Sequence, residues 1–99
     1  MAKSLDELKR ECDFNPKFIE AMHNKMVVGF TKYGSWKTNR CDVNIKANID
    51  ARWEAYQKTG NIEMLEDIAN FAMLEWSLPL NPKAHRDGKD QTAPKIKKF

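Results

Sequence analysis

The side chains best suited to chemistry are carboxylates on both sides of a turn at Gly60. Asp50 and Glu54 lie ten and six residues before this glycine, and Glu66 and Asp67 lie six and seven residues after it. In an antiparallel helix hairpin, residues equally distant from the turn can face one another, so these carboxylates could converge in one layer. Such oxygen-rich clusters suit Mg²⁺ or Mn²⁺, which bridge phosphate oxygens and help to activate water.

Glu63 belongs to the same acidic group, because Glu63, Asp67 and Asn70 recur at three- or four-residue spacing and share one helix face. The candidate metal ligands are therefore Asp50, Glu54, Glu63, Glu66 and Asp67. The alternative is that the two acidic residues before the turn are ordinary surface charges, paired with Lys46, Arg52 or Lys58. Spacing alone leaves both interpretations open.

A second candidate site lies near the end of the first long predicted helix. Lys32 could neutralise phosphate charge, and the rings of Tyr33 and Trp36 could stack on a base. The alternative is that the two rings close the end of the hydrophobic core. Composition does not distinguish a nucleotide-binding loop from a core-closing one.

The segment that must position these residues is 59–76, with the sequence TGNIEMLEDIANFAMLEW. Asn61 can cap a helix, and Gly60 suits the left-handed conformation that ends the preceding one. Apolar residues recur at helical spacing and cover most of the circumference. We therefore expect a buried helix, on which acidic groups are costly unless they are paired or bound to metal.

Two other helices are expected at the beginning of the chain. A Ser-x-x-Glu capping box starts a short helix that ends near residue 11 and should bury Leu5 and Leu8. Asn15 and Pro16 start the first long helix, and Gly34 ends it.

The second long helix is expected over residues 43–58, with Asp42 as its cap. A connection of about three residues forces this helix and the next into an antiparallel hairpin. No strand pattern is present. The predicted fold class is all-α, a helical bundle built on an antiparallel helix hairpin.

Charge divides the chain into two parts. Residues 83–99 hold six basic and two acidic side chains and carry +4, so residues 1–82 carry −1 of the net +3. We expect one α-helical domain over residues 1–82 and a basic tail over residues 83–99 without a fold of its own. The tail could contact nucleic acid, or it could simply be a solvated segment.

Hydropathy and cysteine usage favour a cytoplasmic protein that does not enter a membrane. No window of about 18 apolar residues exists, and the first residues do not resemble a secretory signal. Cys12 and Cys41 are far apart and are predicted to be reduced. Two Cys and two His without ligand spacing argue against structural zinc.

Residues 65–73, LEDIANFAM, resemble the third-helix signature of the all-α NTP pyrophosphohydrolases, the MazG-like superfamily. They are similar to small archaeal and phage members with a D-[IV]-A-N-F-x-M pattern. Three other segments are also similar to that group: RWEAY at 52–56, TGNIE at 59–63, and KYG at 32–34 followed by Trp36. The resemblance covers about residues 18–82.

The resemblance implies a bundle that dimerises or tetramerises and a Mg²⁺-dependent cleavage of a nucleoside triphosphate to the monophosphate and pyrophosphate. Family members hold metal with an E-E-x-x-E run and an E-x-x-D run. Asp67 matches the Asp of the second run, but Met64 occupies the place of its Glu. The first run is degraded too, because the expected carboxylate positions hold Ala47, Asn48 and Ala51.

Two hypotheses of different class follow. In the first, the protein is a Mg²⁺- or Mn²⁺-dependent NTP pyrophosphohydrolase with Asp67 and Glu54 as catalytic carboxylates. Lys32 would then neutralise phosphate, and Asn70 would hold a phosphate or a water in the outer hydration shell of the metal. In the second, it is a non-catalytic oligomerisation or interaction module with a basic tail. Under either hypothesis a homodimer or tetramer is expected, because three long helices cannot easily bury both sides of so apolar a last helix.

Overall fold

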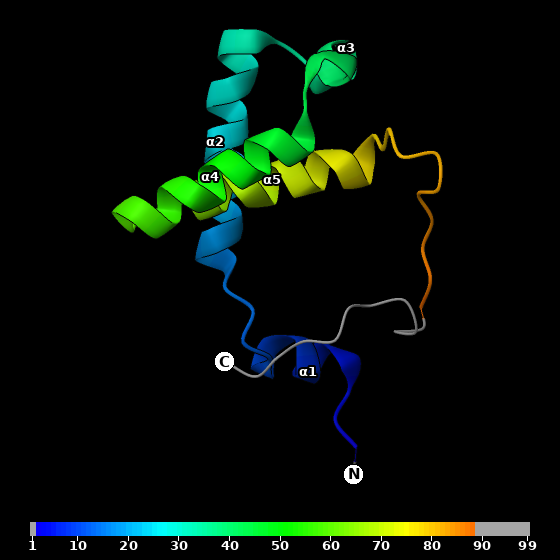
Figure 1. Ribbon diagram of the computed structural model, residues 1–99. Coiled ribbons are helices and arrows are strands. Elements are labelled where there is room, and N and C mark those ends of the chain that lie inside the picture. Colours follow the sequence, from blue (N-terminus) through cyan, green and yellow to red (C-terminus); the bar gives the residue numbers. More distant parts are fainter. Residues whose placement is uncertain (1, 89–99) are drawn as a thin grey trace.

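The computed structural model describes residues 2–88, and Figure 1 shows the arrangement of its helices. Its elements in chain order are α1 (Leu5–Glu11), α2 (Pro16–Tyr33), α3 (Trp36–Asn39), the 3₁₀ turn η1 (Arg40–Asp42), α4 (Ile45–Thr59) and α5 (Glu63–Ser77). Helices without any strand make up the regular structure of residues 2–88, which confirms the all-α prediction. None of the helices in this range is long and apolar enough to cross a bilayer. Most of the predicted basic tail, residues 89–99, lies outside the described residues.

Helix caps follow the local sequence closely at the start of α1 and α2. Ser4 Oγ accepts a hydrogen bond from the backbone N–H of Glu7 at 3.2 Å, and Asn15 Oδ1 accepts one from Lys17 at 2.9 Å. The predicted cap of α4 was wrong. Asn44 caps this helix, with its Oδ1 accepting from Ala47 at 2.9 Å, because the preceding residues are taken up by η1.

The turn between α4 and α5 reverses the chain, so that α5 runs back beside α4 (Figure 1). Gly60 ends α4 in the left-handed region, at φ 72°. The cap residue of α5 is Ile62, which makes no side-chain capping hydrogen bond. Asn61, predicted to be the cap, lies one residue earlier, and its Oδ1 accepts from the backbone N–H of Glu63 at 3.0 Å.

α5 is the central element, since it packs against α4 and also against α2. Its burial is less complete than the sequence predicted. Among residues 2–88, Leu74 is the single buried hydrophobic residue, at 5% exposure, and no side chain in this range is completely buried. Ile62, Met73 and Trp76 remain exposed, because α2 and α4 cover only two sides of the helix.

α1 stands apart from the other helices (Figure 1). The prediction that it buries Leu5 and Leu8 was wrong, because these side chains are 66% and 50% exposed. The capping box marks where the helix begins, but a helix buries its apolar residues only where another element packs on them.

Candidate functional site

Asp67 is the one predicted metal ligand that lies at a junction of three helices. Its Oδ1 is 3.1 Å from Lys25 Nζ of α2, and its Oδ2 is 3.3 Å from Arg52 Nε of α4. All three side chains are less than one-third exposed. Both carboxylate oxygens of Asp67 therefore already have a cationic partner, and the ion pairs join α2, α4 and α5.

Arg52 extends this network in two further directions. Its Nη1 donates to Asn48 Oδ1 at 2.8 Å. The guanidinium carbon lies 4.7 Å from the centre of the Phe71 ring, a cation–π arrangement between α4 and α5. The sequence indicated Arg52 only as an ion-pair partner of Asp50 or Glu54. In the structure Arg52 pairs with Asp67, which is fifteen residues away in the chain.

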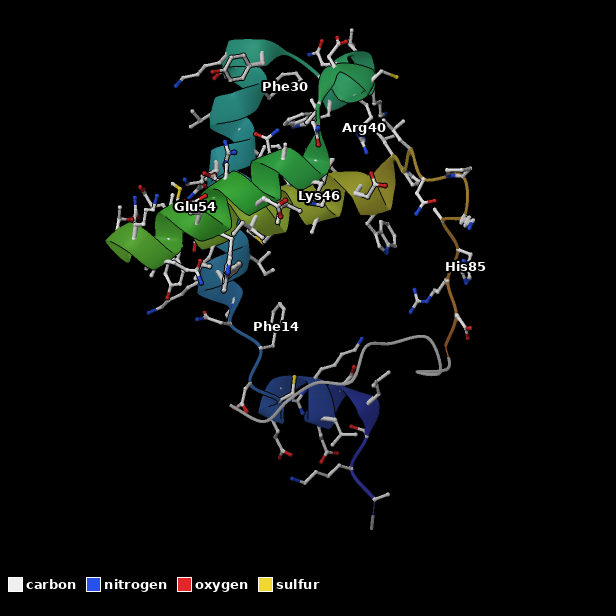
Figure 2. The ribbon with its side chains drawn as sticks, viewed as in Figure 1. Phe14, Phe30, Arg40, Lys46, Glu54 and His85 are labelled. Atoms are coloured by element: carbon white, nitrogen blue, oxygen red, sulfur yellow. The ribbon has the colours of Figure 1, made fainter. Side chains whose placement is uncertain are left out.

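The two carboxylates of α4 pair within their own helix. Lys46 Nζ lies 2.5 Å from Asp50 Oδ2, and Lys58 Nζ lies 2.9 Å from Glu54 Oε1 (Lys46 and Glu54 are labelled in Figure 2). These pairs are at i and i+4 and are exposed, as the surface-charge alternative predicted.

The predicted convergence of carboxylates is not seen in the described residues. No group of three or more His, Cys, Asp or Glu in residues 2–88 is placed to hold a metal ion. Glu63 is exposed. Glu66 lines a cavity beside Phe18, and Asp67 does not line that cavity. Because the oxygens of Asp67 face Lys25 and Arg52, the donor set of a single copy does not fit Mg²⁺ or Mn²⁺.

A cavity of about 200 Å³ lies beside the Asp67 network. Its lining includes four residues that were predicted to form the site, namely Tyr33, Trp36, Asp67 and Asn70. The ring of Trp36 packs edge-on against the ring of Phe71, with 6.0 Å between the ring centroids. This contact agrees with the alternative in which Trp36 closes the end of the core, whereas Tyr33 is exposed. Lys32 does not line this cavity.

Asn70 is buried between α5 and α2. Its Nδ2 donates to the backbone carbonyl of Met22 at 3.0 Å. Its Oδ1 is buried and has no hydrogen-bond partner within the described residues. An unsatisfied buried acceptor costs about 1–3 kcal/mol, so Asn70 stabilises the fold less than its burial suggests.

Arg40 is a buried residue that sequence analysis missed. It extends from η1 towards the end of α5 (Figure 2). Its Nε donates to the backbone carbonyl of Leu78 at 2.7 Å, its Nη1 donates to that of Val43 at 3.2 Å, and its Nη2 forms an ion pair with Glu75. No spacing signal could reveal it, because its partners on α5 are more than thirty residues away.

The Asp50 carboxylate raises the pKa of Lys46, first through their hydrogen bond and then through its charge. We expect Asp50→Asn to lower the pKa of Lys46 towards its ordinary value, because the ammonium form loses its anionic partner. NMR titration of the Lys46 side chain would measure this change. Glu54→Gln is the matched control and should leave the pKa of Lys46 unchanged, and an equal shift in both variants would contradict the pairing.

The site is therefore an ion-pair network at the junction of three helices, beside a small cavity with aromatic walls. The ion pairs of Asp67 join three helices, whereas the pairs of Asp50 and Glu54 lie within α4. Comparisons of the chain with protein-family models, with curated proteins and with solved structures found no match in any of the three.

Proposed function

We propose that the protein is a non-catalytic helical module that works by self-association. The observation that carries this proposal is the imbalance between buried and exposed hydrophobic residues. Leu74 is the single buried hydrophobic side chain in residues 2–88, whereas thirteen large hydrophobic side chains in that range are exposed. Fully burying one such side chain contributes about 1.5–3 kcal/mol, so a single copy leaves most of its available stabilisation unused.

The charged residues support the same proposal. The exposed ion pairs of α4 keep that helix hydrophilic, and Asp67 holds three helices in position rather than facing an open metal site. Large exposed apolar patches are typical of protein surfaces that bind a partner.

Light scattering on the full chain tests this proposal directly. Over the micromolar range, we expect a mass of two or more times the 11.5 kDa of one chain. A mass of 11.5 kDa at every concentration would contradict self-association.

A second candidate function is metal-dependent NTP pyrophosphohydrolase activity. One specific observation favours it: four residues predicted from the sequence to form the site border one cavity, beside the cationic side chains of Lys25 and Arg52. Metal binding at Asp67 would have to compete with these two cations.

Calorimetric titration of Mg²⁺ and Mn²⁺, with and without a non-hydrolysable nucleoside triphosphate, separates the two candidates. The self-association proposal predicts no metal binding that depends on Asp67. Metal binding that strengthens with nucleotide and disappears in Asp67→Asn would favour the enzyme instead.

A further inference from the structure

We infer that the second copy binds along one apolar stripe of α5, antiparallel to it, about a two-fold axis near Ala69. This inference rests on the proposed self-association and specifies its surface. The α5 stripe consists of Ile62, Leu65, Ala69, Met73 and Trp76.

The α5 stripe lies on the side of α5 opposite α4 and borders the beginning of α2 along one edge. Asp67 contacts α2 and α4, and Phe71 receives Arg52 of α4. Ala69 is two residues from each of them, so at 100° per residue it lies about 160° around the helix from both. Neither the intramolecular ion pairs nor the aromatic contacts occupy this side.

Exposure along the α5 stripe is greatest at its two ends. Trp76 is 78% exposed and Ile62 is 65% exposed, whereas Ala69 is half-buried. None of the five side chains carries a charge. A small residue at the centre allows the axes of two helices to approach closely, while the large residues at the ends reach across.

The spacing of the α5 stripe is complementary to itself. Ile62 precedes Ala69 by seven residues, and Trp76 follows it by seven. In an antiparallel pair centred on Ala69, Ile62 of one copy would therefore cover Trp76 of the other, and the reverse contact would form at the other end. Leu65 and Met73, four residues before and after the centre, would meet in the same way. This reciprocity is the property that a two-fold interface requires.

α2 continues the same apolar surface. Ile19 and Met73 line one cavity of about 230 Å³ between α2 and α5. Ile19 is exposed and precedes the point at which α2 crosses α5, so it lies beside the α5 stripe and extends the same surface.

The area of this surface matches what a stable dimer needs. A standard interface buries roughly 800 Å² per partner, of which somewhat more than half is apolar. That requires on the order of 500 Å² of apolar surface. The exposed parts of Trp76, Ile62, Met73 and Ile19 together provide an area on the order of 500 Å², since an aromatic side chain alone contributes about 150–250 Å² when fully exposed.

Disulfide cross-linking tests the position of the axis. In a Cys12→Ser, Cys41→Ser background, Ala69→Cys should give a covalent dimer on mild oxidation. The reason is that position 69 of one copy would lie beside position 69 of the other at the two-fold axis. Ala51→Cys is the matched control, since Ala51 is an exposed alanine on α4 and should not cross-link. Equal cross-linking of the two variants would overturn the inference.

A pair of charge substitutions tests the surface without a new cysteine. Trp76→Glu should weaken the dimer by about 30-fold or more, because it places a charge in an apolar contact at the end of the α5 stripe and removes an aromatic anchor. Val28→Glu, on an exposed apolar residue of another helix, should leave the dimer unchanged. Circular dichroism should show that both variants keep their helices.

The outcomes separate the inference from the proposal on which it rests. Suppose that the wild-type chain is a dimer, that Trp76→Glu is also a dimer, and that Ala69→Cys does not cross-link. These results would overturn the α5 surface while leaving self-association intact. A wild-type chain that is monomeric throughout would overturn both.

Discussion

Replacing Arg40 with alanine is expected to destabilise the protein by about 3 kcal/mol. The arginine side chain is buried and satisfies two backbone carbonyls, those of Leu78 and Val43, in addition to pairing with Glu75. Alanine would leave these acceptors without donors and a carboxylate without its partner, which costs about 3–5 kcal/mol where both charges are buried. The lower figure applies because the Glu75 side chain is 36% exposed. Urea unfolding followed by circular dichroism measures the loss.

Two control variants make this result specific. Arg40→Lys keeps the positive charge but cannot donate in several directions at once, so it should recover only part of the stability. Lys37→Ala removes an exposed cation from α3 and should change stability by less than about 0.5 kcal/mol. An Arg40→Ala variant as stable as Lys37→Ala would show that the link between η1 and α5 contributes nothing.

Replacing Asp67 with alanine is expected to destabilise the protein by about 2–3 kcal/mol. Lys25 and Arg52 would then face each other without the carboxylate that separates them, in a partly buried site. Removing one partner of such a network leaves uncompensated charge, which is more costly than removing the whole network. Thermal or urea unfolding gives the free energy.

The double variant Asp67→Ala, Lys25→Met provides the sharper comparison. It removes one of the two orphaned cations and should recover part of the stability lost in Asp67→Ala. Asp50→Ala, which removes an exposed carboxylate, should have little effect. If Asp67→Ala were as stable as wild type, Asp67 would not be a structural residue and the metal-ligand hypothesis would gain weight.

The parts of the fold that were predicted correctly depend on residues close together in the chain. Asn15, Gly60 and Asn61 act within one or two residues of their own positions, so their roles at helix ends can be inferred from the sequence. The pairing of Asp50 with Lys46 is likewise an i, i+4 contact within one helix.

The parts that could not be predicted depend on contacts between distant segments. Lys25 forms an ion pair with Asp67 although the two residues are forty-two positions apart in the sequence. Nothing in the local sequence of either residue indicates the other. Leu5 and Leu8 follow a helical pattern, but whether a pattern is buried depends on which elements pack together. Asp67 likewise shares a helix face with Glu63, but its partners come from α2 and α4, which the local sequence does not indicate.

The most direct test of the central claim is the thermal unfolding midpoint of the full chain at several protein concentrations. If two copies complete one hydrophobic core, folding and association are coupled, and the midpoint should rise by about 3–6 °C for each tenfold increase in concentration. A midpoint that does not change from low to high micromolar concentration would show that one copy is stable alone. That result would contradict the proposal that a second copy completes the core.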